Sequence, residues 1–244
     1  MKENGSLRKF LSRKKRIPTC SAVIVAAGAS SRMGKDKICM EIGGVPVIIR
    51  AIRAFEESEL IDEIVVVTRE DRLSEISELI SNYGFDKVTS VISGGATRFE
   101  SSLAGVLSVR KEAKLVAIHD CARPLVSQRI ISDTVYAASE FGAACPVVEC
   151  TDTMKLKSGD YLGENVDRAS LCAVQTPQIF SIDIIKGALT YVVKNNLPVT
   201  DDTSAVAYLG FKTRIVQGER DNIKLTTVED IPYAEAILKK RGEL

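Results

Sequence analysis

The chain has 244 residues, of which 45% are hydrophobic and 27% are charged, a composition typical of a soluble globular protein. No apolar run approaches the roughly 20 residues that a membrane-spanning helix needs, so we expect no membrane partner. Six scattered cysteines argue against a disulfide scaffold, and a single histidine argues against a histidine-based metal site. Reduced thiols are typical of a cytoplasmic protein.

Charge is distributed unevenly along the chain. Residues 1–20 carry seven Lys and Arg against Glu3 alone, whereas the whole chain has a formal net charge of +1. Such a stretch can be a nucleic-acid arm or a membrane-surface patch, but it is more often a solvated tail. Phe10 is its only aromatic residue, too few for stacking on bases. We therefore expect a flexible N-terminal extension and no nucleic-acid partner.

Beyond this extension, short β-branched runs alternate with helical periodicities. Continuous apolar runs predict buried strands at residues 22–26, 64–67 and 115–118, and further short strands are predicted at 88–92 and 143–148. Apolar residues three or four positions apart predict the intervening helices. The stripes are Ile48, Ile52 and Phe55; Leu73, Ile76, Leu79 and Ile80; Leu103, Val106 and Leu107; Ile131, Val135 and Ala138; and Ile185, Leu189 and Val192. The alternation predicts an open, doubly wound, mostly parallel α/β sheet.

Local signals predict several helix ends. Pro46 suits a first helical turn, and Ser181 suits an N-cap. Thr227 and Asp230 resemble a capping box, and the helix that follows them should end at Gly242 after three basic residues.

Residues 150–176 interrupt the alternation. The segment is polar, lacks a helical stripe and contains a Ser-Gly-Asp turn near its middle, which predicts an extended hairpin projecting from the sheet. A lone two-stranded arm is marginally stable, so we expect it to pack on a second copy of the chain and form a homodimer. No linker-like stretch divides the remainder, so residues 21–244 are predicted to be one domain with an arm at about 150–176.

Ligands of parallel α/β sheets bind beyond the carboxyl ends of the strands. This rule selects residues 26–37, 93–98 and 119–124 as one edge of the sheet, where a ligand site is expected.

The first of these segments reads AAGASSRMGKDK and matches neither the dinucleotide-binding fingerprint nor the P-loop. Ala26, Ala27 and Gly28 would let a ligand approach the backbone closely. Arg32 and Lys37 would supply positive charge for a polyphosphate. A surface loop with ordinary charges is the alternative interpretation.

The segment HDCARP follows another predicted strand. Asp120 suggests Mg²⁺ or hydroxyl binding, with Arg123 on a phosphate or on the Asp itself; a purely structural Asp–Arg pair is the alternative. We expect His119 to be a structural residue rather than a base. Lys224 precedes the last helix and could reach the same edge, and helix capping explains at least one of the two carboxylates in TDDTS.

The ordered set AAGASSRMG, GGATR, HDCARP, DTMK, VDR, QTPQ, TDDTSAV and DNIKLTT resembles the 2-C-methyl-D-erythritol 4-phosphate cytidylyltransferases of the non-mevalonate isoprenoid pathway. The resemblance covers residues 22 to about 240. It implies a Rossmann-like nucleotidyltransferase that transfers CMP from CTP to a polyol phosphate and releases pyrophosphate, with Mg²⁺ or another divalent cation held mainly by the CTP phosphates.

The resemblance also implies roles for individual residues. Arg32, Lys37 and Lys224 would be the catalytic cations. They would bind the triphosphate and stabilise negative charge at the α-phosphorus. The nucleotide would lie against Ala26, Ala27, Gly28, Gly94, Gly95 and Ser101. The acceptor would be bound by Asp120 and Arg123 and, through an arm that this family contributes from the dimer partner, by Thr153 and Arg168. Because Asp36 and Ile38 flank Lys37 where many members read Pro-Lys-Gln, Lys35 stays an alternative to Lys37.

This chemistry explains why no base is evident. Both reacting groups are phosphate anions, so catalysis requires positioning and cationic stabilisation rather than a base or a covalent nucleophile. A D-ribitol 5-phosphate cytidylyltransferase would share the chemistry, but its arm typically lacks the paired DTMK and VDR. A non-catalytic nucleotide-binding regulator would be expected to have lost some of Arg32, Lys37, Asp120 and Lys224, all of which are present.

Overall fold

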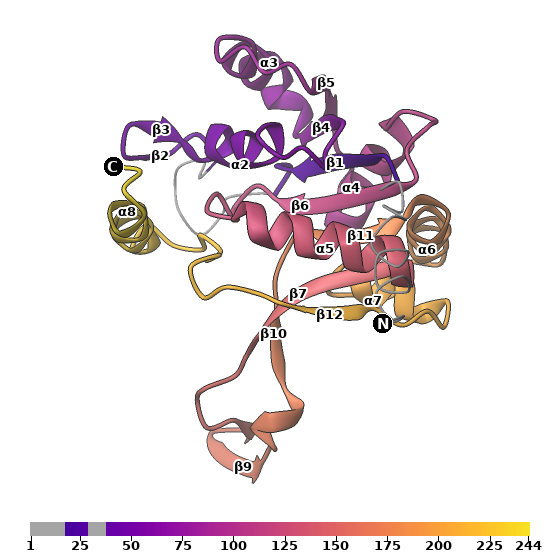
Figure 1. The fold of residues 1–244 in the computed structure, drawn as a ribbon. Coiled ribbons are helices and arrows are strands. Elements are labelled where there is room, and N and C mark those ends of the chain that lie inside the picture. The colour runs from indigo at the N-terminus through magenta and orange to yellow at the C-terminus, as the bar shows by residue number, and fades with distance from the viewer. Residues whose placement is uncertain (1–17, 29–37) are drawn as a thin grey trace, which may run out of the picture.

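The structure, a computed structural model, describes residues 18–28 and 38–244. Within them, an eight-stranded sheet has the order β10-β7-β11-β6-β1-β4-β5, and β12 also pairs with β7 (Figure 1). The strands of this sheet are β1 (Cys20–Val25), β4 (Glu63–Thr68), β5 (Val88–Ser93), β6 (Leu115–Asp120), β7 (Ala143–Glu149), β10 (Cys172–Val174), β11 (Gln178–Ser181) and β12 (Arg214–Gln217).

Most neighbouring strands of the sheet are parallel. β1 runs parallel to β4 and β6, β4 to β5, and β7 to β12. β11 lies antiparallel between β6 and β7, and β10 is antiparallel to β7. The predicted mostly parallel sheet is thus confirmed, and each predicted strand is present. The sequence did not predict β10, β11 or β12 as separate strands.

Helices cover both faces of the sheet, as a doubly wound fold requires. One hydrophobic core includes buried residues of α2 (Val47–Glu56), α3 (Leu73–Ser81), α5 (Gln128–Phe141) and α8 (Asp230–Arg241). The other includes those of α4 (Arg98–Ser108), α6 (Ile182–Asn195) and α7 (Asp202–Tyr208). Successive residues of β1 alternate between the two, since Ala22 and Ile24 join the first core and Val23 the second. This arrangement explains why the strand is apolar from Ala22 to Val25.

The smaller elements are β2 (Glu41–Ile42), β3 (Val45–Pro46), and the 3₁₀ turns η1 (Glu70–Arg72) and η2 (Arg168–Ser170). In the part of the chain that the structure describes, none of the helices has the length and apolar character to span a bilayer.

The predicted helix ends are only partly correct. Gly242 ends α8 with a φ of +73°, as expected for a left-handed C-cap, and Pro46 stands immediately before α2. The capping-box prediction is half correct: the carboxylate of Asp230 accepts a hydrogen bond from the N–H of Thr227, as in a capping box, but α8 begins only at Asp230 and its N-cap residue is Glu229. Ser181 occupies the N-cap position of α6 but makes no side-chain capping bond.

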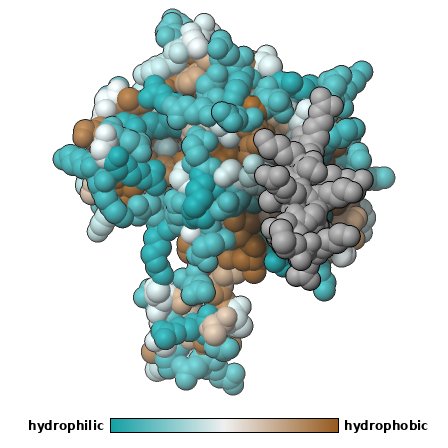
Figure 2. All heavy atoms as spheres, viewed as in Figure 1, coloured by the Kyte–Doolittle hydropathy of each residue, from teal (hydrophilic) through white to brown (hydrophobic). Residues whose placement is uncertain are grey.

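The predicted arm is present. β8 (Lys155–Ser158) and β9 (Tyr161–Asn165) form an antiparallel hairpin that projects from the body of the molecule beyond β7 and β10 (Figure 1). Gly159 has a φ of +58° in the turn between them. Apolar surface is visible where the arm leaves the body (Figure 2), and Tyr161 and Leu162 at its tip are 81% and 79% exposed.

Candidate active site

A cavity of about 240 Å³ opens at the carboxyl ends of β1 and β6. Its position agrees with the general rule for α/β sheets. Seven residues selected from the sequence line it: Ala26, Ala27, Gly28, Gly95, Ser101, Asp120 and Lys224.

Backbone hydrogen bonds hold the strand ends around this cavity together. The N–H of Ala26 donates to the carbonyl of Val67 at 2.7 Å, and the N–H of Cys121 donates to the carbonyl of Val25 at 3.0 Å. These bonds continue the parallel pairing just past the ends of the strands. The loops that follow β1 and β6 therefore start side by side.

The glycine turn before α4 packs directly on the first loop. A Cβ atom on Gly94 would lie 2.9 Å from the Cβ of Ala27 and 2.5 Å from the Oγ of Ser101, and one on Gly95 would lie 2.3 Å from the Cβ of Glu100. Neither position has room for a side chain, which explains both glycines. Ser101 is buried, and its Oγ accepts a hydrogen bond from the N–H of Gly95 at 3.2 Å, so its hydroxyl braces the turn.

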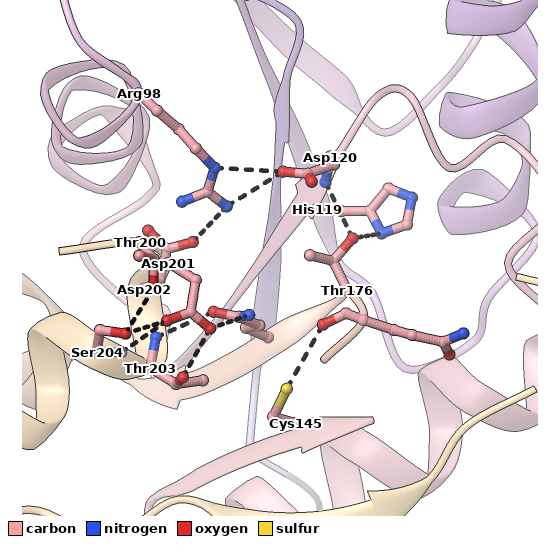
Figure 3. A network of polar contacts seen from close by, with 12 residues as sticks. Arg98, His119, Asp120, Cys145, Thr176, Thr200, Asp201, Asp202, Thr203 and Ser204 are labelled. Atoms are coloured by element: carbon pink, nitrogen blue, oxygen red, sulfur yellow. Dashed lines mark hydrogen bonds and ion pairs between the residues drawn. The ribbon is translucent and has the colours of Figure 1, made fainter. Parts of the chain in front are cut away.

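Charged side chains form a chain of ion pairs at the site, and Figure 3 shows its part from Asp120 through Arg98 to Asp202. The Oδ2 of Asp120 lies 2.7 Å from the Nζ of Lys224, and its Oδ1 lies 3.1 Å from the Nη2 of Arg98. The same Nη2 lies 2.7 Å from the Oδ2 of Asp202, a fully buried carboxylate at the start of α7. Burial alone would raise the pKa of Asp120, but the two cations hold that pKa well below its usual value. Asp120 is therefore ionised at neutral pH.

The pKa of Asp202 shifts in the opposite direction from that of Asp120. Its complete burial raises its pKa, and the neighbouring Arg98 only partly opposes this effect. Its adjacent residue Asp201 caps α7 by accepting a hydrogen bond from the N–H of Ser204 at 2.9 Å. Helix capping thus explains one of the two carboxylates, as expected, and the ion pair with Arg98 explains the other.

Sequence reasoning missed Arg98 as a site residue. It is the first residue of α4, where the helix dipole disfavours a cation. This arginine follows a glycine turn on the ligand-binding edge. Its unfavourable position at the start of a helix could have predicted an acidic partner nearby. Its partners Asp120 and Asp202 come from two other elements of the fold.

His119 is a structural residue, as expected. It is fully buried, its Nε2 donates to the carbonyl of Arg123 at 3.0 Å, and its Nδ1 accepts from the Oγ1 of Thr176 at 3.0 Å. The same Oγ1 accepts a hydrogen bond from the N–H of Asp120 at 3.1 Å (Figure 3). Burial lowers the pKa of His119 to about 4, so the ring is neutral and both nitrogens are occupied. The ring thus links the backbone of Arg123 to the side chain of Thr176.

Arg123 does not line the cavity. Its Nη1 donates to the carbonyl of Asn222 at 2.7 Å, and its Nη2 donates to the carbonyl of Val174 at 3.2 Å. These contacts tie the HDCARP turn to the segment before Lys224 and to β10. Substrate binding by Arg123 stays a prediction, and the observed contacts give the side chain a structural role.

Comparisons with known proteins agree with this geometry. Residues 20–240 match the sequence profile of IspD, the 2-C-methyl-D-erythritol 4-phosphate cytidylyltransferase family. A protein of that name from Clostridium tetani is 40% identical over 90% of this chain and 90% of its own length. The chain belongs to this family. Another protein of that name, from Caldanaerobacter subterraneus subsp. tengcongensis, is 40% identical over 90% of this chain and 99% of its own.

Solved structures of the cytidylyltransferase family share the fold. The 4-diphosphocytidyl-2C-methyl-D-erythritol synthase from Anaerococcus prevotii superposes with a TM-score of 0.81 at 30% identity, covering 91% of this chain and 96% of the other. The 2-C-methyl-D-erythritol 4-phosphate cytidylyltransferase from Thermus thermophilus gives a TM-score of 0.74 at 29% identity, over 91% and 99% of the two chains.

The two arm residues expected to bind the acceptor in this cytidylyltransferase family do not line the cavity of their own chain. Thr153 precedes β8, and Arg168 opens the turn η2 after β9. The Nη1 of Arg168 donates to the carbonyl of Thr151 at 3.0 Å, and Arg168 lines a separate hollow of about 400 Å³ near the base of the arm. Within the described residues of one chain, the structure brings together Asp120 and Lys224 but leaves the arm residues apart.

Two predicted catalytic residues of this cytidylyltransferase, Arg32 and Lys37, lie outside the described residues, as does the alternative Lys35. Gly28 and Ile38, the described residues on either side of that segment, both line the cavity.

The described cavity wall carries both signs of charge, and Asp202 behind the wall pairs with Arg98. Arg98 and Lys224 carry positive charge, and Asp120 is the only carboxylate among the wall residues that the structure describes. In residues 18–28 and 38–244, no three Asp, Glu, His or Cys side chains gather in a way that could hold a metal ion. Because both oxygens of Asp120 already contact cations, these residues do not form a cage for Mg²⁺ on their own.

Proposed function

We propose that this chain transfers CMP from CTP to 2-C-methyl-D-erythritol 4-phosphate in isoprenoid precursor biosynthesis. The products are 4-diphosphocytidyl-2-C-methyl-D-erythritol and pyrophosphate. Membership of the cytidylyltransferase family supports the reaction. The observation that carries the proposal is the cavity at the ends of β1 and β6, where Asp120 and Lys224 meet among small residues of both loops.

The chemistry requires little beyond positioning and positive charge. The acceptor phosphate attacks the α-phosphorus of CTP, the new P–O bond forms, and the bond to the β-phosphate breaks to release pyrophosphate. A phosphate monoester has its second pKa near about 6, so it is mostly a dianion at neutral pH and needs no base. The neutral, fully hydrogen-bonded His119 agrees with this requirement.

We assign the roles of the described residues accordingly. Ala26, Ala27 and Gly28 would form the wall against the nucleotide, with the glycine turn opposite. Lys224 would stabilise negative charge at the reacting phosphates, since its ammonium already lies beside the cavity. Asp120 would accept hydrogen bonds from acceptor hydroxyl groups, because the two cations keep it ionised. Arg32 and Lys37, which we assign from the sequence alone, would bind the triphosphate.

We propose Mg²⁺, or another divalent cation, as the cofactor, held mainly by the CTP phosphates. The described wall offers only the carboxylate of Asp120, whose oxygens already contact cations, so the substrate phosphates would supply most of the ligands of the ion. The ion would neutralise charge on the triphosphate and favour departure of pyrophosphate.

We propose that the enzyme is a cytoplasmic homodimer in which each arm completes the site of the partner. The exposed apolar tip of the arm supports this arrangement, as does the fact that neither Thr153 nor Arg168 lines the cavity of its own chain. The proposed location rests on the composition, with its scattered cysteines.

The decisive experiment measures pyrophosphate release with CTP and Mg²⁺, offering methylerythritol phosphate and ribitol phosphate in parallel. We expect release with the first acceptor and little with the second. Release with ribitol phosphate alone would keep the mechanism but overturn the acceptor. No release with either acceptor, from a protein that still binds CTP, would contradict catalysis and favour a nucleotide-binding regulator.

A further inference from the structure

Lys224 is placed by a segment without regular secondary structure. Residues 218–229, between β12 and α8, contain neither helix nor strand. A lysine side chain has four rotatable bonds, so its ammonium group is well positioned only if the backbone that carries it is fixed. The backbone here must be fixed by hydrogen bonds to other parts of the chain.

Gln175 supplies the first set of these bonds. It is only 5% exposed, and both ends of its side-chain amide are occupied. The Nε2 donates to the carbonyl of Glu219 at 2.7 Å, and the Oε1 accepts from the N–H of Glu219 and from the Nδ2 of Asn222, each at 3.3 Å. A Cβ atom on Gly218 would lie 2.5 Å from this Oε1, so glycine is needed for the close approach.

Asn222 supplies the second set, two residues before Lys224. It is fully buried, and its Nδ2 donates to the carbonyl of Thr176 at 3.0 Å. Immediately after Lys224, the N–H of Leu225 donates to the carbonyl of Ala122 at 2.8 Å. The backbone is therefore held on both sides of the lysine.

Thr176 connects this segment to the acidic partner of Lys224. Its carbonyl accepts from Asn222, and its Oγ1 accepts from the N–H of Asp120. One residue thus fixes the backbone of both members of the ion pair between Lys224 and Asp120. Neither Asn222 nor Gln175 lines the cavity, so any effect of these two residues on the reaction must pass through the groups that they hold.

We propose that Asn222 and Gln175 are positioning residues that set the place of the Lys224 ammonium relative to Asp120 and the cavity. The consequence for turnover rests on the proposed function, whereas the position of the ammonium can be tested without it. Removal of either side chain should release Lys224 from Asp120 while leaving the nucleotide wall of the cavity intact.

Asn222→Asp is the sharpest variant, because it is nearly isosteric but directs a carboxylate oxygen at the carbonyl of Thr176 and the Oε1 of Gln175. Gln175→Ala is the second variant, in case the first does not fold. Thr134→Val is the matched control: it removes a fully buried hydrogen bond, from the Oγ1 of Thr134 to the carbonyl of Ile130 in α5, away from the site. Melting temperatures would be recorded for all three.

The first measurement is the rate at which limiting acetic anhydride acetylates Lys224, followed by mass spectrometry. Release from the ion pair should raise this rate at least about threefold in Asn222→Asp and Gln175→Ala. The rate should not change in Thr134→Val, nor at the exposed Lys186 and Lys194 of α6 in any variant. An unchanged Lys224 rate in folded variants would overturn the proposal.

The second measurement is a double-mutant cycle with Lys224→Met. In the native background, Asn222→Asp should lower kcat at least about tenfold with a smaller change in the KM for CTP. In the Lys224→Met background it should lower kcat by less than about twofold, because the group that it positions is gone. Equal losses in both backgrounds would contradict positioning through Lys224. An inactive native enzyme would instead refute the proposed function and leave the acetylation result to judge the inference.

Discussion

The Nζ of Lys224 lies 2.7 Å from the Oδ2 of Asp120, although 104 residues separate them in the sequence. The other oxygen of Asp120 is bound by Arg98, so this carboxylate lies between two cations. The arrangement keeps Asp120 ionised and keeps Lys224 at the wall of the cavity, where a triphosphate would need it. The charge balance of the site is therefore the property that substitutions should disturb first.

Asp120→Asn tests this carboxylate directly. The amide keeps the shape of the side chain but cannot bind two cations, and it is a weaker acceptor for hydroxyl groups. Loss of a hydrogen bond to a charged group is worth about 1.5–3 kcal/mol, so kcat/KM for the polyol phosphate should fall about 10- to 100-fold. Steady-state kinetics would measure this fall. Asp133→Asn, in an exposed ion pair on α5, should change kcat/KM less than about twofold, and an equal effect of both would refute the assignment.

Arg98→Met tests the dependence of Asp202 on its only ion-pair partner among the described residues. The substitution leaves a fully buried carboxylate without a counter-charge, which typically destabilises a protein by about 3–5 kcal/mol. Because the Arg98 side chain is 27% exposed, we expect a loss of about 3 kcal/mol in the free energy of unfolding, measured with urea.

The combined variant Arg98→Met with Asp202→Asn separates this cause from lost packing. Removing the buried charge as well should recover at least about 1 kcal/mol of the lost free energy of unfolding. If the double variant is as unstable as the sum of the two single variants, the buried charge is not the reason for the loss.

His119 predicts a pH dependence of stability. Burial lowers its pKa from 6.5 to about 4, so between these values the unfolded chain binds a proton that the folded chain does not. The free energy of unfolding should therefore fall as the pH drops from 6.5 towards 4, by up to about 3 kcal/mol, and be unaffected by this residue above that range. His119→Gln can keep a donor and an acceptor but does not titrate. Its stability should fall less over the same range, and parallel curves for the two proteins would contradict the prediction.

The strands and the location of the site were accessible from the sequence because both follow local rules. Strand β1 is apolar from Ala22 to Val25 since it is buried on both faces, and ligand binding at carboxyl ends placed Ala26 and Asp120 on one edge. β11 and β12 are only four residues long, and partly polar, so they carry no usable periodicity. Their pairing is determined by tertiary contacts with β6 and β7.

Side-chain partners were harder to predict than positions. Arg98 bonds with Asp202, which lies 104 residues away in the sequence. No local sequence pattern predicts a contact between residues that far apart. For Arg123 the sequence suggested a phosphate or Asp120 as partner, whereas the side chain bonds with two backbone carbonyls. Carbonyl partners are available at every residue, so composition alone does not reveal them.

The choice between Lys37 and Lys35 can be decided by substitution. We expect Lys37→Ala to lower kcat at least about 100-fold, since a cation at the reacting phosphates is removed. Lys35→Ala should stay within about threefold of the native enzyme and serves as the matched control. The reverse result would move the catalytic role by two positions.

Arg168→Ala tests the role of the arm in binding. Loss of a guanidinium from a phosphate should raise the KM for the polyol phosphate about 10- to 100-fold while changing that for CTP less than about threefold. Lys157→Ala, on the exposed strand β8 of the same hairpin, is the control for general loss of charge. Equal losses for both substrates, or none, would remove Arg168 from the acceptor site.

Mixing two impaired variants, assayed at a polyol phosphate concentration at which each alone is nearly inactive, tests whether the arm acts on the partner subunit. If each site combines Lys224 of one chain with Arg168 of the other, a heterodimer of Lys224→Ala and Arg168→Ala contains one site with both residues intact. Random exchange makes half of the dimers heterodimers, so about a quarter of the native activity should return after the variants are unfolded and refolded together. If both residues of a site came from the same chain, every site would lack one of them and no activity would return. Each variant refolded alone is the control, and recovered activity should track the fraction of heterodimer measured by native mass spectrometry.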